Sequence, residues 1–79
     1  MKAVVTVTLK PDVLDPQGQA IQKACHSLGH ESVLNVRQGK HFEIELGTED
    51  PGQATALLEE LGDKLLANPV IENYTVEIA

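Results

Sequence analysis

The sequence predicts an α+β fold of the ferredoxin-like class, in which a four-stranded antiparallel sheet carries two helices on one face. Three observations support this fold: four short stretches alternate in hydrophobicity, two longer stretches have helical spacing, and their order is strand-helix-strand-strand-helix-strand. The order is also a weak internal duplication, because each half contains a strand, a loop, an Asp-Pro pair, a helix and a strand. Two right-handed βαβ units joined by a hairpin close into such a sandwich. We expect one domain over residues 1–79.

The first half begins with a β-branched, alternating stretch at residues 2–9, whose odd-numbered side chains we expect to face the core. Asp15 then reads as a helix N-cap, with Pro16 at the first helical position. The helix that follows has one apolar stripe and ends at Gly29. The stripe consists of Ile21, Ala24, Cys25 and Leu28.

The second half begins with a predicted β-hairpin. Its strands cover residues 33–37 and 41–46, and its tight turn is Gln38-Gly39-Lys40, where Gly39 is free to take positive φ. Asp50-Pro51 starts a second helix, which Asn68-Pro69 ends because the residue before a proline is disfavoured in the α region. The last strand covers residues 70–78.

The predicted fold leaves one face of the sheet without helices. That face would mix Val and Thr side chains with charged ones, and both edge strands would be unprotected. Sheets of this kind are commonly covered or extended by a second copy. We therefore expect at least a homodimer.

Charge and composition exclude several functions. Six basic residues against twelve acidic ones give a net charge of −6, and only two aromatic residues could stack on bases, so nucleic-acid binding is not expected. No apolar run is long enough to cross a membrane, and no signal peptide is recognisable. The single cysteine, Cys25, fits a reducing compartment. We expect a cytoplasmic protein without membrane contact.

No residue pattern indicates catalysis or metal binding. His26 and His30 are i, i+4 neighbours, but no third ligand is spaced to complete a metal site, and Cys25 lies on the apolar stripe as an inert thiol would. The glutamates alternate with core residues or occupy the polar side of a helix, as solvated carboxylates do. Free N–H groups near Gln17 and Gly18 could receive a phosphate, but Asp15 brings negative charge to that helix end.

Three basic residues leave two interpretations open. Lys10, Arg37 and Lys40 make up half of the basic residues, and they lie in or near the first loop and the hairpin turn. They either balance acidic neighbours such as Glu43, or contact an acidic partner surface or a substrate phosphate.

Four phrases of the sequence resemble the PurS family, the small subunit of phosphoribosylformylglycinamidine synthase. They are Leu9-Lys10-Pro11, Val13-Leu14-Asp15-Pro16-Gln17-Gly18, Gly39-Lys40 and Leu65-Leu66-Ala67-Asn68-Pro69-Val70-Ile71-Glu72-Asn73-Tyr74. The resemblance covers the whole chain in length and element order.

The resemblance implies a subunit without an active site of its own, which bridges a glutaminase subunit and a large ATP-dependent synthetase subunit. The complex would use glutamine, ATP and Mg²⁺ to convert formylglycinamide ribonucleotide into the formylglycinamidine in purine synthesis, with ammonia passed between subunits. This chain would bind no cofactor and would form a dimer or tetramer. We expect partner contacts, by residue, at Lys10, Asp15, Pro16, Gln17, Gly18, Arg37, Gly39, Lys40, Asn68, Pro69, Glu72 and Tyr74.

Other proteins of this fold provide the alternatives. A regulatory module resembling the ACT domain would bind a small molecule at a dimer interface and need no large partners. An acylphosphatase-like enzyme needs arginine and glycine in the first loop, and residues 10–15 contain neither. A copper chaperone needs two cysteines there. Fold alone does not choose among these.

Overall fold

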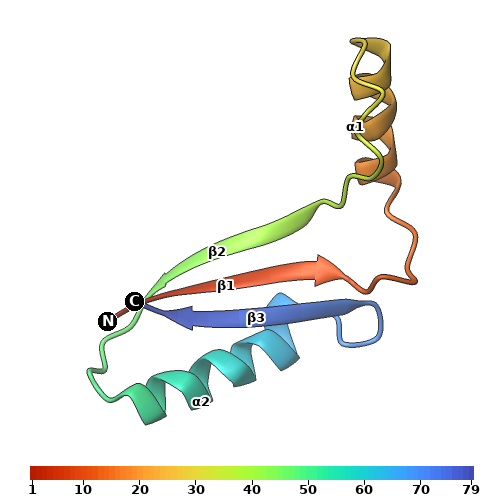
Figure 1. Ribbon diagram of the computed structural model, residues 1–79. Helices are drawn as coiled ribbons and strands as arrows, with labels where there is room; N and C mark the ends of the chain where they lie inside the picture. The colour runs from red at the N-terminus through yellow and green to blue at the C-terminus, as the bar shows by residue number, and fades with distance from the viewer.

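The computed structural model describes all residues, 1–79, and contains a three-stranded antiparallel sheet and two α-helices (Figure 1). The strand order is β2-β1-β3, so β1 lies in the centre. None of the helices is long and apolar enough to cross a membrane. In chain order the elements are β1 (Lys2–Leu9), α1 (Pro16–Ser27), β2 (Gly39–Glu45), α2 (Pro51–Leu61), a π-helical turn η1 (Gly62–Leu66) and β3 (Glu72–Ile78).

The core lies between the central strand and α2. Val5 of β1 pairs with Phe42 of β2 and Val76 of β3, and its side chain is fully buried. Leu58 of α2 is also fully buried against this face. The odd-numbered residues of β1 thus face the core, as predicted. Because α2 packs against β3, the β2 side of the same face has no helix of its own, and Phe42 and Ile44 stay half-exposed there.

Helix α1 stands away from the sheet (Figure 1). It packs against neither the sheet nor α2, and its companion is the chain segment 31–38, which runs back along it toward β2. Gln22 Nε2 donates to Leu34 O at 2.7 Å, and the His26 ring lies 2.8 Å from Val33 O. We call residues 16–38, the helix and this returning segment, the arm.

The prediction of four strands is wrong. Residues 33–37 form no strand, and Gln38-Gly39-Lys40 is not a turn, because β2 already begins at Gly39, where Thr8 is its partner. A Cβ at Gly39 would lie 2.7 Å from Val7 O, so this glycine allows a close backbone approach rather than a positive φ. The only residue with positive φ is Gly29, at 95°, where a helix stop was predicted.

The prediction of two helices on one face of the sheet is also wrong, for a related reason. A hairpin at residues 38–40 would have returned the chain across the sheet. Instead the chain passes straight from the arm into β2 and holds α1 beyond the end of the sheet (Figure 1).

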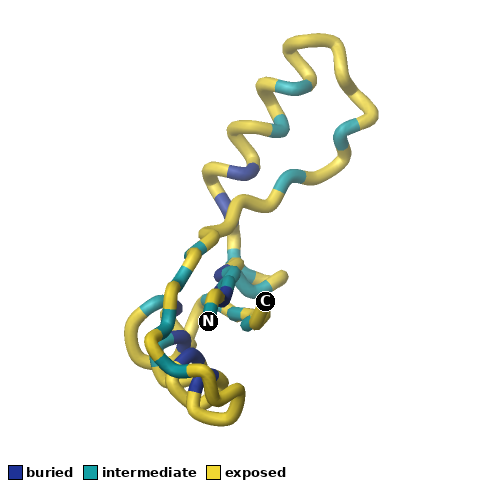
Figure 2. Tube along the Cα trace, turned by 90° about the vertical axis from the view of Figure 1, so that its left-hand side faces the viewer, coloured by how far each residue is buried: buried dark blue, intermediate teal, exposed yellow.

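The molecule is extended and poorly buried for its length. Its radius of gyration is 15.9 Å, against about 12 Å for a compact domain of this size. Its accessible surface is 5636 Å², roughly 1,000 Å² above the expectation of about 4,700 Å². Only nine residues are buried, and most of the arm is exposed (Figure 2). A single copy therefore leaves apolar surface that a folded domain normally covers.

Candidate functional site: the junction end of the sheet

The sequence-predicted interface residues gather at one end of the sheet. The end of β1 and the beginnings of β2 and β3 meet there, since Thr8 pairs with Gly39 and Leu9 pairs with Glu72. Lys10 N donates to Ile71 O at 2.8 Å, which joins the first loop to the last one. The first loop and the loop before β3, which both contain expected contact residues, thus form one continuous region.

On the arm side, Asp15 organises the junction. Its Oδ1 accepts from Gly18 N at 2.9 Å, the N-cap bond that was predicted, and its Oδ2 accepts from Gln38 N at 2.7 Å. The side chain is almost fully buried, with Asp15 only 4% exposed. The Gly18 and Gln38 amides, with the positive charge of Arg37, hold the pKa of Asp15 below its ordinary value of 3.8. Gln17 lies beside it at the edge of a small cleft, while Pro16 is exposed.

On the α2 side, Asn68 and Glu72 order the loop before β3. Asn68 Oδ1 accepts from Val70 N, its carbonyl accepts from the amides of Ile71 and Glu72, and its own amide donates to Glu72 Oε1 at 2.7 Å. The loop therefore presents Pro69 and Val70 to solvent on a fixed backbone, and Val70 is 77% exposed. These hydrogen bonds are a sufficient reason for Asn68 and Glu72 to stand where they do, without any contact to a partner.

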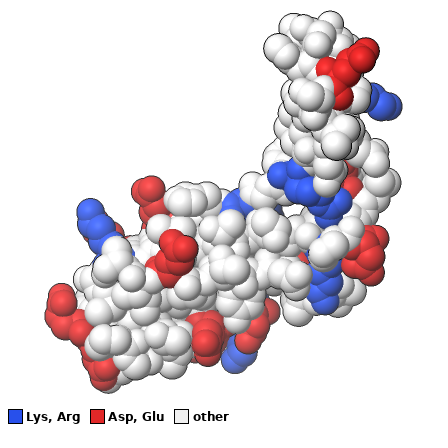
Figure 3. Space-filling model, viewed as in Figure 1, with Lys and Arg blue, Asp and Glu red and all other residues white.

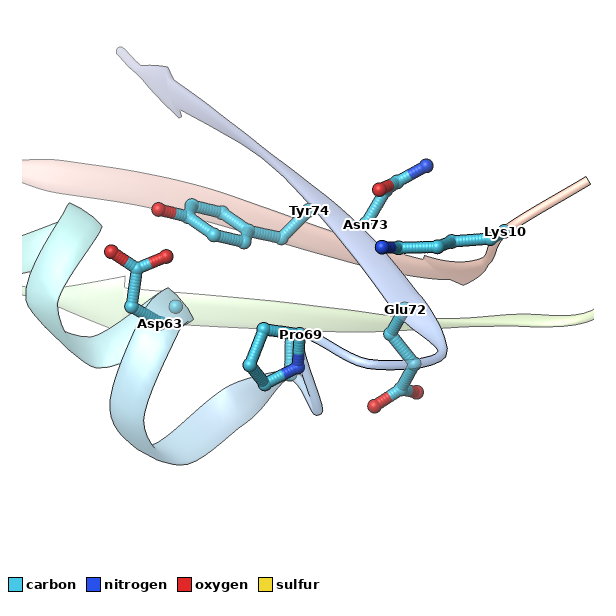
Figure 4. Close-up of a pocket in the computed structure, with 8 residues that line it drawn as sticks. Lys10, Asp63, Pro69, Glu72, Asn73 and Tyr74 are labelled. Atoms are coloured by element: carbon cyan, nitrogen blue, oxygen red, sulfur yellow. The ribbon is translucent and has the colours of Figure 1, made fainter.

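A cleft of about 350 Å³ lies between this loop, η1 and the start of β3 (Figure 4). The Tyr74 ring lies against Gly62, where a Cβ would be 2.5 Å from Cε2, and its hydroxyl donates to Glu59 O at 3.2 Å. The adjacent Asp63 carboxylate, together with burial and the Glu59 charge, raises the pKa of Tyr74. The residues that line the cleft are Lys10, Gly62, Asp63, Ala67, Pro69, Glu72, Asn73 and Tyr74.

The three basic residues near the junction differ in their surroundings. Lys40 Nζ lies 4.0 Å from Glu72 Oε2, whereas Glu43 lies near His41 rather than near any of the three. Arg37 Nη2 donates to Lys10 O and Val13 O, both at 2.9 Å, and no carboxylate lies within ion-pair distance of Arg37 or Lys10. Basic side chains are visibly grouped where the arm meets the sheet (Figure 3). The local-balance interpretation thus fits Lys40 by an ion pair and Arg37 by its charge near Asp15, but it does not fit Lys10.

The histidine and cysteine residues of the arm do not converge on a metal site. Cys25 is half-buried, and the His26 ring bonds to a backbone carbonyl across the arm. No group of three or more His, Cys, Asp or Glu side chains is arranged to hold a metal ion.

Three residues of the junction were missed from the sequence. Gln38 binds the second oxygen of Asp15, Gly62 supports the Tyr74 ring, and Asp63 faces the Tyr74 hydroxyl (Figure 4). Gly62 did carry a signal, because a glycine inside a helical pattern often marks a close contact. The other two contacts depend on the path of the chain and left no pattern to read.

Comparison with known proteins identifies the family. The model of the PurS family, described as phosphoribosylformylglycinamidine (FGAM) synthase, matches residues 2–79. The chain belongs to the PurS family. It is 47% identical to the PurS subunit of Mycobacterium leprae, over 95% of this chain and 91% of that one, and 46% identical to the PurS subunit of Bacillus subtilis, over 98% and 90%. The resemblance predicted from the four phrases is thereby confirmed.

Solved PurS structures superpose on nearly the whole of this chain. The Bacillus subtilis PurS structure matches with a TM-score of 0.86 at 46% identity, over 96% of this chain and 94% of that one. A chain of PurLQS from Thermotoga maritima matches with a TM-score of 0.87 at 29% identity, over 96% and 93%. The α+β class is confirmed, and the arm is part of the overlap in both comparisons.

Proposed function

We propose that this chain is the non-catalytic bridging subunit of an FGAM synthase complex, where it joins a glutaminase subunit to an ATP-dependent synthetase subunit and helps to pass ammonia between them. PurS family membership and the likeness to a chain of PurLQS support the assignment. The junction end adds a physical reason, because its loops are ordered by internal hydrogen bonds yet present exposed side chains. Such pre-ordered surfaces lose little entropy on docking.

We further propose that the chain acts as a homodimer in which each arm packs on the other copy. The observation that carries this is the mismatch within one chain: α1 has no sheet to cover, and the β2 side of the sheet has no helix. Apolar side chains of the arm are accordingly exposed, and Leu34 is 83% exposed. A second copy of the same chain supplies both missing parts reciprocally, as two-fold symmetry requires.

Two further observations favour a second copy as the occupant. The amides of residues 34–37 donate to no backbone carbonyl of their own chain, which leaves a free edge for strand pairing. The surplus surface of roughly 1,000 Å² is also close to the roughly 800 Å² that one partner contributes to a stable interface. The alternation at residues 33–37 then belongs to a strand whose partner lies in another chain.

The test of the dimer is the molar mass in solution, measured by sedimentation equilibrium for the wild type, Leu34→Glu and Leu65→Glu. The wild type should have twice the mass of one chain, and Leu34→Glu should weaken association by at least roughly tenfold, because a charge would be buried in the interface. Leu65 is 72% exposed but lies on η1, outside the arm, so Leu65→Glu should remain dimeric. A Leu34→Glu variant that associates like the wild type contradicts arm exchange.

The test of the bridging role is assembly. Mixed with both large subunits, the chain should co-elute with them in one complex on size-exclusion chromatography. The proposed contact residues at the junction end should be protected from hydrogen exchange in that complex, namely in residues 9–18, 37–40 and 68–74. Separate elution of all three subunits under turnover conditions contradicts the bridging role.

A further inference from the structure

The point where the arm leaves the sheet is held by a group of hydrogen bonds that we call the hinge clamp, made by Asp15, Gly18, Arg37 and Gln38. Asp15 bonds the amides of Gly18 and Gln38 with its two oxygens. Arg37 Nη2 bonds the carbonyls of Lys10 and Val13 in the loop that leads to α1. The clamp therefore holds together the two segments that connect the arm to the sheet, namely the loop before α1 and the segment that enters β2.

The clamp is more elaborate than the start of a helix requires. The second Asp-Pro helix start gives the comparison within the same chain. The Asp50 carboxylate accepts only from Gly52 N and is exposed, whereas the Asp15 carboxylate is buried and also accepts from a residue 23 positions away. A Cβ at Gly18 would overlap Val36 O, while a Cβ at Gly52 would meet only Asp50 Oδ1, at 3.4 Å. Asp15 and Gly18 thus bring two segments of backbone together, a task that Asp50 and Gly52 do not share.

The contacts made by Asp15 and Gly18 restrict the direction in which α1 leaves the sheet. Within residues 10–15, the loop that leads to α1, the only backbone hydrogen bond is that from Val13 N to Lys10 O, at 2.9 Å. The β2 side of the sheet carries no helix that could compete with a returning α1. With the first turn of α1 bound to Gln38, the helix must leave the sheet in the same direction as the segment that enters β2 (Figure 1). A helix held in this way cannot fold back over β2.

We infer that the hinge clamp fixes the direction of the arm and thereby makes the exchange of arms between two copies, rather than a closed single chain, the stable state. The inference rests on the proposed dimer and adds the residues that select it. Asp15, Gly18, Arg37 and Gln38 act in it as positioning residues, because the hydrogen bonds of the clamp all join groups of the same chain.

The experiment measures arm direction and association in the same full-length variants. Spin labels at Ser27→Cys in the arm and Glu77→Cys on β3, in a Cys25→Ser background, report one intrachain distance when labelled chains are diluted with unlabelled ones. Asp15→Ala and Arg37→Ala break the clamp. Asp50→Ala removes the equivalent helix cap, and Lys23→Ala removes an exposed positive charge of the arm that has no ion pair. Arg37 is exposed, so its variant tests the inference even if Asp15→Ala does not fold.

The clamp variants should broaden or shorten the intrachain distance and raise the dimer dissociation constant about tenfold or more, the effect expected from losing one or two such hydrogen bonds. The two control variants should change neither value. A clamp variant that changes only one of the two values, or neither, overturns the inference. A wild type that is monomeric at every concentration instead removes the proposed dimer, which is a different result.

Discussion

At the scale of single residues, Asp15 is distinctive because a nearly buried carboxylate has both oxygens bonded to backbone amides. These amides favour the charged form, so the pKa of Asp15 is lower in the folded chain than in the unfolded one. A carboxylate shifted in this direction stabilises the fold fully above its unfolded pKa, near 3.8, and loses that contribution as the pH falls through the folded value.

Asp15→Asn should therefore remove part of the acid sensitivity of the fold. The substituted amide can accept from one N–H but must point its own NH₂ at the other, so the variant should be less stable than the wild type at pH 7. The difference between the two should shrink between pH 4 and pH 2. Urea midpoints measured across this range check the prediction, with Asp50→Asn as the matched control. A constant difference at all pH values would count against the assigned role of Asp15.

Gly62 is a second residue whose role rests on one contact. Gly62→Ala should lower stability by about 1–3 kcal/mol, because the new methyl group would press on the Tyr74 ring, whose hydroxyl is bonded to Glu59 O. Gly47→Ala is the control, since a Cβ there meets nothing within 4 Å, and its effect should stay within about 0.5 kcal/mol. Urea unfolding of both variants decides the matter, and equal midpoints would contradict the packing role of Gly62.

The residue-level predictions from sequence succeeded where the reason is local. Asp15 as an N-cap and Gly29 as a helix stop follow from backbone chemistry within a few positions, and both are confirmed. Gly39 was predicted to be free to take positive φ in a turn, but it allows close contact with a strand instead. Local sequence does not distinguish the two uses of glycine, because the second depends on a neighbour that is distant in the chain.

At the scale of elements, α2 is the only helix that stabilises the sheet of its own chain. Leu58→Ala should cost about 2–5 kcal/mol, because Leu58 is fully buried in a core with few members. Leu57→Ala, one position along and 41% exposed, should cost about 1 kcal/mol or less. Denaturant unfolding monitored by circular dichroism measures both. Similar losses for the two would show that α2 is not the main cover of this core.

Helices and strands were predictable, apart from one segment, because hydrophobic residues recur along the sequence with the period of each element. The exception, residues 33–37, alternates as a strand does but has no strand partner within its own chain. Hydrophobic alternation records that a strand-like segment is covered on one side. It does not specify the partner strand, and for this reason a four-stranded sheet was expected where the chain forms three strands.

At the scale of the whole molecule, the proposed dimer should make stability depend on association. With a core of few residues and an uncovered arm, a single chain should be marginal, so the melting temperature should rise with protein concentration. Calorimetry over a hundredfold concentration range measures this, and Leu34→Glu should weaken the dependence. A melting temperature independent of concentration would indicate that one copy is a complete folding unit.

The measurement that tests the account most directly is FGAM formation by the glutaminase and synthetase subunits, with and without this chain, driven either by glutamine or by ammonia. A bridging subunit should raise the glutamine-driven rate strongly and leave the ammonia-driven rate nearly unchanged, because free ammonia needs no transfer between subunits. The same glutamine-driven rate in the presence and absence of the chain would contradict the account.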